Sequence, residues 1–393
     1  MSPVTLDRAE LAETLREIGA DAWLLFDFHG INPVTNRVLG ISGGMATRRL
    51  FVLLPAAGDF VAVAHKIELQ PVEGFPGTVV PYARWEELHK ALEPLVAGRT
   101  IAMEVSTEDA VPYLDRVPHG VVQLITKLGG TVVSSAPLVT RFAARWQPSE
   151  VEDHTFAAEV LARVAQDAIR KAVSSINEGL TESAMQAEVI RAMEAGGLEL
   201  DTLPIVAFGA NAANPHYEPI TGKDATLRDG DVVLLDLWAG RTKTTVFADQ
   251  TWMGFAGANP PERIQRIWRT VREARDQGIA AVMNAAASGQ PLAGYQVDQA
   301  ARAVIEAAGF GEAFVHRTGH SIDRELHGSG PHLDSYETLD DRQLMPGVGF
   351  SIEPGIYLPG DVGMRSEINM YWALTGPVVT PARPQVELMT RAG

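Results

Sequence analysis

Apolar and polar positions alternate between helical and strand-like periods in the first part of the chain. Residues 10–19 repeat apolar side chains at the three- to four-residue spacing of an amphipathic helix. Short apolar runs that predict buried strands follow at 21–27, 48–55, 60–65, 100–106 and 130–137. Residues 1–145 are therefore expected to form a compact α/β domain.

A longer helical period begins near residue 146. Pro148 lies at the entry of a long predicted helix, with Ser149 as its expected cap and Gly179 as its expected end. Thr181 is expected to start the next helix, and two more are predicted over 262–278 and 297–309. Short strands separate these helices, so residues 146–393 are expected to form a second, mixed α/β domain.

Composition narrows the class of protein. The 393 residues are 46% hydrophobic and 21% charged, which is typical of a globular protein. The net charge of −16 argues against nucleic acid or an anionic membrane as a partner. The chain has no cysteine, which excludes disulfides and thiolate chemistry. Its apolar runs are too short to span a bilayer, and its charged N-terminus predicts a helix rather than a signal sequence, so a cytoplasmic protein is expected.

Five residues with metal-ligand chemistry occur in the second domain, within the segments LLDLW, VFADQTW, HRTGHSI, FSIEPGIY and MRSEIN: Asp236, Asp249, His320, Glu353 and Glu367. An aspartate at a strand end is, taken alone, more often a turn residue. Together, however, four carboxylates would be costly to bury without compensation, and two divalent cations would neutralise their four negative charges. The pattern predicts a dinuclear metal hydrolase.

The order of these ligands and their flanks resembles the pita-bread metallopeptidases, which include methionine aminopeptidase, Xaa-Pro aminopeptidase and prolidase. Two further segments carry the resemblance: HRTGHSIDRELHG, with three spaced histidines, and PIVAFGANAANPHYEP, which ends near a histidine. The resemblance implies an α/β two-domain fold, with an N-terminal creatinase-like domain (1–145) and a C-terminal pita-bread catalytic domain (146–393). Methionine aminopeptidases generally lack the N-terminal domain, so the prolidase and Xaa-Pro aminopeptidase branch is favoured.

Carried over by resemblance, Asp249 and Glu367 would bridge two metals. Asp236 would bind one of the metals, and His320 and Glu353 would bind the other. Ligation dominated by carboxylates, with no sulfur, favours a hard or borderline ion. The resemblance points to two Mn²⁺ ions per chain, with Co²⁺, Zn²⁺ and Fe²⁺ as alternatives.

The resemblance also implies catalytic roles. A hydroxide held between the two metals would attack the scissile bond, with Glu353 taking the proton and passing it to the leaving nitrogen. His327, helped by His216, would stabilise the developing oxyanion, and His316 would line the same pocket as a hydrogen-bond donor.

Three positions depart from the family pattern. Twelve residues rather than ten separate Asp236 from Asp249, and an even insertion keeps both carboxylates on one face of a sheet. The small residue usual two places after the first aspartate is Trp238, and the acidic residue often found after the last histidine is Gly328. These departures suggest a subgroup.

The implied substrate is a small peptide with proline at its second position, and the expected reaction is hydrolysis of the Xaa-Pro bond in dipeptides. Arg48 is the expected partner of the dipeptide carboxylate, because a loop containing Gly43 and Gly44 leads into the strand predicted over 48–55, and alternation within that strand lets only one of Arg48 and Arg49 face the site. Arg365 is a second candidate, which could instead support the metal site. An Xaa-Pro aminopeptidase acting on longer peptides is the main alternative. Creatinase-like C–N hydrolysis and a non-catalytic binding module on the same fold are more distant ones. Relatives are commonly homodimers, and a homodimer is expected here.

Overall fold

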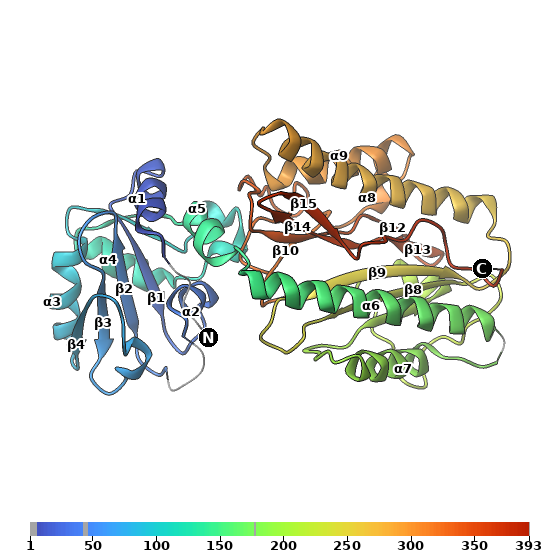
Figure 1. The fold of residues 1–393 in the computed structure, drawn as a ribbon, viewed down its shortest axis with the longest axis horizontal. Coiled ribbons are helices and arrows are strands. Elements are labelled where there is room, and N and C mark those ends of the chain that lie inside the picture. The colour runs from blue at the N-terminus through green and yellow to red at the C-terminus, as the bar shows by residue number, and fades with distance from the viewer. Residues whose placement is uncertain (1–5, 42–45, 177, 393) are drawn as a thin grey trace. The chain divides into compact units, whose positions relative to one another are not determined.

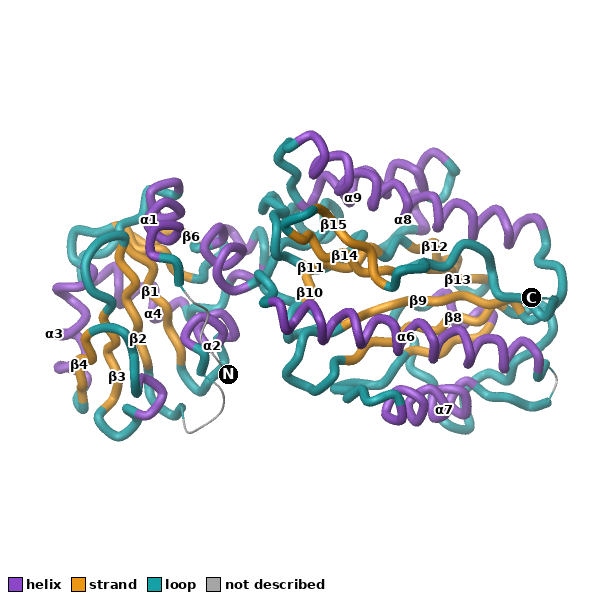
Figure 2. Tube along the Cα trace, in the orientation of Figure 1, coloured by secondary structure: helices purple, strands orange, loops and turns teal. Residues whose placement is uncertain are grey.

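The computed structural model describes residues 6–41, 46–176 and 178–392. The chain divides into two compact units, Met1–Ala143 and Ala144–Gly393, each of which has hydrophobic cores of its own (Figure 1). Each unit combines helices with sheet, as the hydrophobic pattern predicted, and Figure 2 shows how the two types of element are distributed along the chain.

The N-terminal unit is built on a six-stranded mixed sheet of order β4-β3-β2-β1-β5-β6. Its strands are β1 (Ala22–Asp27), β2 (Leu50–Pro55), β3 (Val61–His65), β4 (Thr78–Tyr82), β5 (Thr100–Met103) and β6 (Thr131–Ser134). Its helices are α1 (Arg8–Glu17), α2 (Pro33–Leu39), α3 (Trp85–Val96), α4 (His119–Lys127) and the short α5 (Ala136–Leu138).

Strand β1 shows why this sheet is covered on both faces. All six of its residues are buried, and they alternate between two cores. Trp23 and Leu25 pack in the core that includes Leu11 of α1, whereas Leu24 packs in the core that includes Leu88 of α3. A central strand with two buried faces has a continuous apolar sequence, which is the pattern seen here.

The C-terminal unit contains three small sheets, of order β7-β8-β9, β10-β11-β14-β15 and β12-β13. The strands are β7 (Ile205–Phe208), β8 (Val232–Ala239), β9 (Ala248–Phe255), β10 (Ser321–Ile322), β11 (Gly349–Ile352), β12 (Gly355–Leu358), β13 (Val362–Arg365), β14 (Ile368–Ala373) and β15 (Gly376–Thr380). The helices are α6 (Pro148–Ser174), α7 (Glu182–Ala195), α8 (Glu262–Ser288) and α9 (Gly294–Ala307). In Figure 1, α6 and α7 lie on one side of the strands and α8 and α9 on the other.

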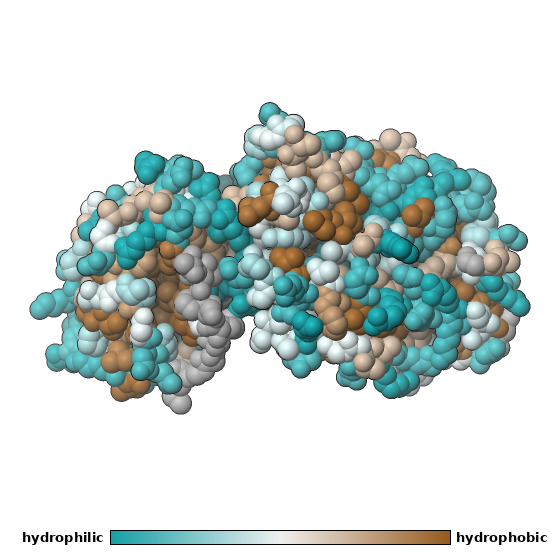
Figure 3. All heavy atoms as spheres, viewed as in Figure 1, coloured by the Kyte–Doolittle hydropathy of each residue, from teal (hydrophilic) through white to brown (hydrophobic). Residues whose placement is uncertain are grey.

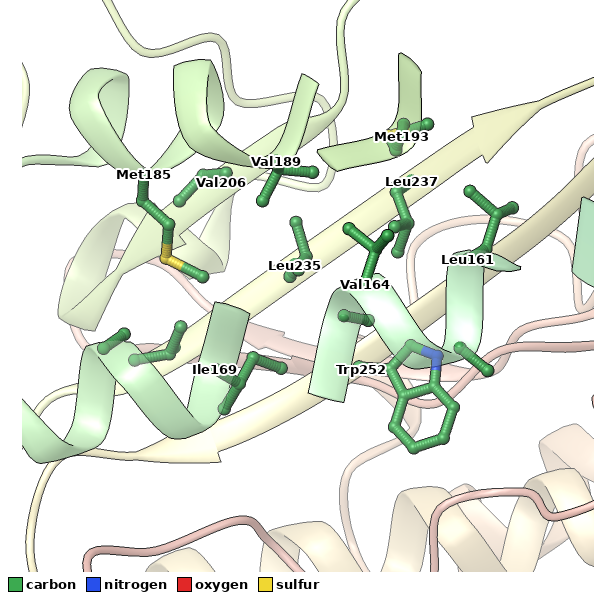
Figure 4. Close-up of a cluster of buried hydrophobic side chains, with 14 of the residues drawn as sticks. Leu161, Val164, Ile169, Met185, Val189, Met193, Val206, Leu235, Leu237 and Trp252 are labelled. Atoms are coloured by element: carbon green, nitrogen blue, oxygen red, sulfur yellow. The ribbon is translucent and has the colours of Figure 1, made fainter. Parts of the chain in front are cut away.

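Strands β8 and β9 carry two different faces. Leu235 and Leu237 of β8 and Trp252 of β9 point toward α6 and α7, where they pack against Leu161 and Met193 (Figure 4). The opposite face of β8 carries Val232, Leu234, Asp236 and Trp238, because side chains alternate along a strand. The helix-covered face is purely a packing surface, which leaves the other face for the polar site.

Several predicted boundaries differ from the structure. Gln147, not Ser149, is the N-cap of α6, with Pro148 at the first helical position and the Glu150 carboxylate accepting a hydrogen bond from the Gln147 backbone (2.6 Å). Helix α6 ends at Ser174, before Gly179. The prediction for Thr181 is confirmed, since it caps α7 through its hydroxyl.

Helix α8 is longer than predicted. It continues through Gly278 to Ser288, because Gly278 faces the core rather than ending the helix. A Cβ added at this glycine would lie 3.1 Å from a methyl carbon of Ile352. The missing side chain therefore permits close packing of α8 against β11.

Hydrophilic residues cover most of the visible face of each unit (Figure 3). None of the helices in the described part of the chain combines the length and the apolarity needed to span a bilayer.

A buried carboxylate ties the N-terminal unit together. Glu104 is fully buried, and its Oε1 accepts hydrogen bonds from Trp23 Nε1 (2.6 Å) and Ser135 Oγ (3.1 Å). Its Oε2 accepts a hydrogen bond from Asn32 Nδ2 (3.0 Å). Asn32 in turn caps α2. The carboxylate thus joins β1, the start of α2 and the segment after β6.

We predict that Glu104→Gln destabilises this unit by about 1–3 kcal/mol, the usual cost of leaving a buried polar group unsatisfied. The amide offers an NH₂ group where the carboxylate offered an acceptor, so one of the three donors faces another donor. Hydrogen exchange of the β1 amides measures the opening of this unit by itself. Glu93→Gln, at an exposed position of α3, is the matched control. Equal exchange in the two variants would contradict the prediction.

Candidate metal centre

The two aspartates lie on one face of a two-stranded ladder. Asp236 of β8 pairs with Thr251 of β9, and Asp249 pairs with Trp238. Directly opposite residues in an antiparallel pair share a face, so all four side chains project to the same side. The expectation drawn from the even spacing of the aspartates agrees with this register. Both aspartates are buried.

His320 approaches from the segment before β10. Its Nδ1 lies 3.1 Å from the backbone carbonyl oxygen of Ser321, and an Nδ1–H that donates there directs Nε2 toward the carboxylates. Nε2 lies 3.4 Å from Asp249 Oδ2 and 3.3 Å from Glu353 Oε1. A histidine fixed in this tautomer by a backbone carbonyl is the usual arrangement of a metal ligand.

The two glutamates come from the other strands of the unit. Glu353 directly follows β11, and Ser351 Oγ donates a hydrogen bond to its Oε1 (2.9 Å). Glu367 lies between β13 and β14, and Thr251 Oγ1 donates to its Oε2 (2.8 Å). Thr251, on the same strand face as Asp249, therefore holds the Glu367 carboxylate.

Arg365 is buried within the same cluster. Its Nε donates to Thr251 Oγ1 (2.8 Å), and its terminal NH2 pairs with Asp236 Oδ2. The Thr251 hydroxyl therefore accepts from Arg365 and donates to Glu367. These contacts orient the carboxylates, so the guanidinium acts on the site through its neighbours.

The electrostatics of the cluster reflect crowded negative charge. Burial raises the pKa of Asp236 to about 7, in spite of the nearby Arg365. Burial and the neighbouring Asp249 raise the pKa of Glu367 well above its usual range. Burial also acts to raise the pKa of Glu353, but His320 and Arg365 outweigh it and lower that pKa. Without added positive charge, the protein alone holds part of this cluster protonated.

The donor set fits a metal site. Ligand atoms of Asp249, His320 and Glu367 all lie within 4.8 Å of one another. Three buried carboxylate oxygens have no hydrogen-bond partner among the residues that the structure describes: Asp236 Oδ1, Asp249 Oδ1 and Glu367 Oε1. Buried carboxylate oxygens normally have a partner, and divalent cations would supply one to all three.

His316 is a half-buried neighbour of this cluster. Its Nδ1 is 2.7 Å from the carbonyl oxygen of Arg317, and its Nε2 is 2.9 Å from the Tyr357 hydroxyl. Burial lowers the pKa of His316 to about 4, so the ring is neutral near pH 7. A neutral ring that donates from Nδ1 accepts from Tyr357 through Nε2. Both nitrogens are thus engaged by protein groups, which suits a positioning role for this histidine.

His327 and His216 are exposed histidines near the cluster. The His327 ring meets that of His320 edge-on, with 4.4 Å between the ring centroids. Although His327 is exposed, enough protein surrounds its ring for desolvation, helped by His320, to lower its pKa to about 3. His216 lies in the loop after η5 (Gly209–Ala213), close enough to lower the pKa of both His316 and His327 further.

Arg48 belongs to the N-terminal unit. It precedes β2, which begins at Leu50, so the prediction that alternation within the strand would distinguish it from Arg49 is wrong. Its backbone N–H donates to Glu68 Oε2 (2.9 Å), and its exposed guanidinium donates to Thr47 Oγ1 (2.8 Å). The glycines at 43 and 44, which suggested a loop, lie outside the described residues.

The sequence did not single out three supporting residues. Ser351 accepts from the His320 backbone N–H (2.9 Å) while it donates to Glu353. Asn369 Oδ1 accepts from the Asp249 backbone N–H (2.9 Å), and Tyr357 holds His316. Only Ser351 carries a local signal, because it lies two residues before Glu353 at the end of a strand. The other two act across long sequence separations.

Comparisons with known proteins agree with this site. A family model described as Metallopeptidase family M24 matches residues 158–372, more than half of the chain. A probable dipeptidase PepE of Mycobacterium tuberculosis is 27% identical over 333 residues, covering 80% of this chain and 79% of that protein. An Xaa-Pro dipeptidase of Lactobacillus delbrueckii subsp. lactis is 34% identical over 195 residues, about half of each chain.

A solved structure matches almost end to end. The dipeptidase PepE of Mycobacterium ulcerans aligns with a TM-score of 0.75 at 23% identity, covering 98% of this chain and 96% of that one. This likeness confirms the expected fold, with an N-terminal sheet domain and a C-terminal pita-bread domain. On the family match, with the buried carboxylate and histidine cluster at its centre, the chain belongs to metallopeptidase family M24.

Proposed function

We propose that this protein is a metal-dependent exopeptidase that hydrolyses the Xaa-Pro bond of dipeptides. The observation that carries the proposal is the buried cluster of carboxylates and His320, three of whose oxygens lack a partner among the described residues. The names of the relatives support the substrate class, since they include a probable dipeptidase and an Xaa-Pro dipeptidase.

The proposed ligands are those expected from the sequence. Asp249 and Glu367 would bridge two divalent ions, Asp236 would bind one ion, and His320 and Glu353 would bind the other. When bound, the ions would activate a water molecule and polarise the scissile carbonyl. The four carboxylates and one imidazole favour Mn²⁺, with Co²⁺, Zn²⁺ and Fe²⁺ as alternatives.

The remaining side chains would handle the proton and the oxyanion. Glu353 would accept a proton and return it to the leaving nitrogen, a role supported by its hydrogen bond from Ser351 and its position beside His320 Nε2. His327 and His216 would donate hydrogen bonds to the oxyanion. His316 would act by holding Tyr357, and Arg365 by orienting Asp236 and, through Thr251, Glu367.

A dipeptide places a free carboxylate directly after the proline. Arg48 is proposed as its partner, because a guanidinium can bind a carboxylate through two parallel hydrogen bonds. An Xaa-Pro aminopeptidase, which acts on longer peptides, would not need this contact. A contact from Arg48 would therefore favour cleavage of dipeptides over cleavage of longer peptides. The homodimer and the cytoplasmic location remain predictions from the sequence.

The first prediction from the proposed function is metal dependence. Purified protein should bind up to two divalent ions per chain, and their removal by a chelator should abolish peptidase activity. It should also lower Tm, because ions that bind only the folded state stabilise it. Asp249→Asn and Glu367→Gln should reduce the bound metal most, since each removes charge from a proposed bridge. Elemental analysis measures the bound metal, and calorimetry measures Tm. Full activity in metal-free protein would refute the proposal.

The second prediction concerns His327. His327→Ala should leave the metal content unchanged and lower kcat by roughly 10²–10³-fold, the usual cost of losing one oxyanion donor. The control is His119→Ala, at an exposed position of the N-terminal unit, which should match the wild type. Loss of bound metal in His327→Ala would show instead that this histidine is a ligand.

The third prediction concerns Arg48. Arg48→Ala should lower kcat/KM for Xaa-Pro dipeptides by at least about tenfold, and leave cleavage of tripeptides that begin with Xaa-Pro within about threefold, because only dipeptides present the carboxylate there. Arg16→Ala, in the last turn of α1, provides the control. Parallel assays with Mn²⁺ measure the difference. An equal effect on both substrate classes would rule out the carboxylate contact.

A further inference from the structure

Trp238 stands in the row of side chains that leads to the proposed metal site. Along β8 the face turned away from α6 and α7 carries Val232, Leu234, Asp236 and Trp238 in succession. Across the ladder, Trp238 lies directly opposite Asp249. Cβ atoms of such pairs are about 4.5–5.5 Å apart, so the indole is a direct neighbour of a proposed bridging carboxylate.

The indole is fixed in place. Its Nε1 donates a hydrogen bond to Thr202 Oγ1 (2.7 Å). It packs against two hydrophobic clusters, one containing Phe247 and Ile322 and the other containing Ile205 and Leu234. A side chain held by a hydrogen bond and by packing on two sides cannot swing aside without losing these contacts.

The same two clusters lead to the proposed oxyanion histidines. Leu326, next to His327, packs against the first cluster, and Tyr217, next to His216, packs against the second. Trp238 packs against both clusters, yet it remains only half-buried. It therefore shares a packing cluster with each of the two segments that carry the proposed oxyanion histidines.

We propose that Trp238 is a specificity-determining residue that forms a fixed apolar wall of the substrate cleft. The wall occupies the space beside Asp249, so the substrate residue that faces it must carry a small side chain. Because the second residue of the proposed substrate is proline, the residue that varies is the first, so the preferred substrates are Xaa-Pro dipeptides that begin with glycine or alanine, and those that begin with leucine or phenylalanine are disfavoured. This inference rests on the proposed function and deepens it.

The test compares the wild type with Trp238→Ala, Trp238→Phe and Thr202→Val, all loaded with Mn²⁺. The substrates are dipeptides that vary in the first residue (Gly, Ala, Leu and Phe before Pro) or in the second (Pro, Ala and Leu after Ala). The wild type should prefer a small first residue by at least about tenfold in kcat/KM, a normal size discrimination for a rigid pocket. Trp238→Ala should reduce that preference by about tenfold, and Trp238→Phe should retain it within threefold. Thr202→Val, which only releases the indole, should give an intermediate value.

Calorimetric binding of the same dipeptides to metal-free protein provides a readout that needs no turnover. If the wild type hydrolyses none of them, the proposed function fails, and the binding preference still decides whether Trp238 is the wall. An unchanged preference in Trp238→Ala, at unchanged metal content and Tm, would overturn the inference. The inference would also fail if none of the dipeptides bound detectably to the wild type, either metal-free or loaded with Mn²⁺.

Discussion

The arrangement of the C-terminal unit depends on the need to compensate the negative charge of four carboxylates in one buried site. Four carboxylates converge near His320, and Arg365, the one buried arginine or lysine of the described residues that pairs with them, offsets one of the four charges. Three negative charges then remain in surroundings where an uncompensated ion costs several kcal/mol. Such a cluster is tolerated only if its members are protonated or if cations bind to it. Three of the carboxylate oxygens also lack a hydrogen-bond partner among the described residues. Such a cluster destabilises the fold by itself, and divalent cations would supply both the missing charge and the missing contacts.

The fold supports this charge with rigid elements. Two of the proposed ligands lie within strands and the other three lie directly beside a strand end. Strand residues supply hydrogen bonds that fix them: Thr251 to Glu367, Ser351 to Glu353 and Asn369 to the backbone of Asp249. The far face of β8 and β9 is anchored by α6 and α7 through an apolar core. A site held on strands by such contacts keeps its geometry more closely than one built on loops.

Local rules predicted some features well and others poorly. The type and order of the main elements followed from periodicity, and Thr181 was expected to start a helix, which its hydroxyl caps. Ser149 was not the cap of α6, because Glu150 completes a capping box with Gln147, so the cap lies two residues earlier. Gly278 did not end α8, because its lack of a side chain serves contact with Ile352, a partner that no local pattern reveals.

The sequence by itself determined which residues of β8 and β9 share a face, because the two-residue period of a strand is a local property. It also determined the chemical kinds of ligand and their order along the chain. Only the tertiary structure decided that Arg365 pairs with Asp236, 129 residues away, and that Thr251 links Arg365 to Glu367, 116 residues beyond Thr251. The same holds for the hydrogen bond between His316 Nε2 and the hydroxyl of Tyr357, 41 residues away. Which side chain completes each hydrogen bond depends on how distant strands pack, and that packing is set by the whole core rather than by any local pattern.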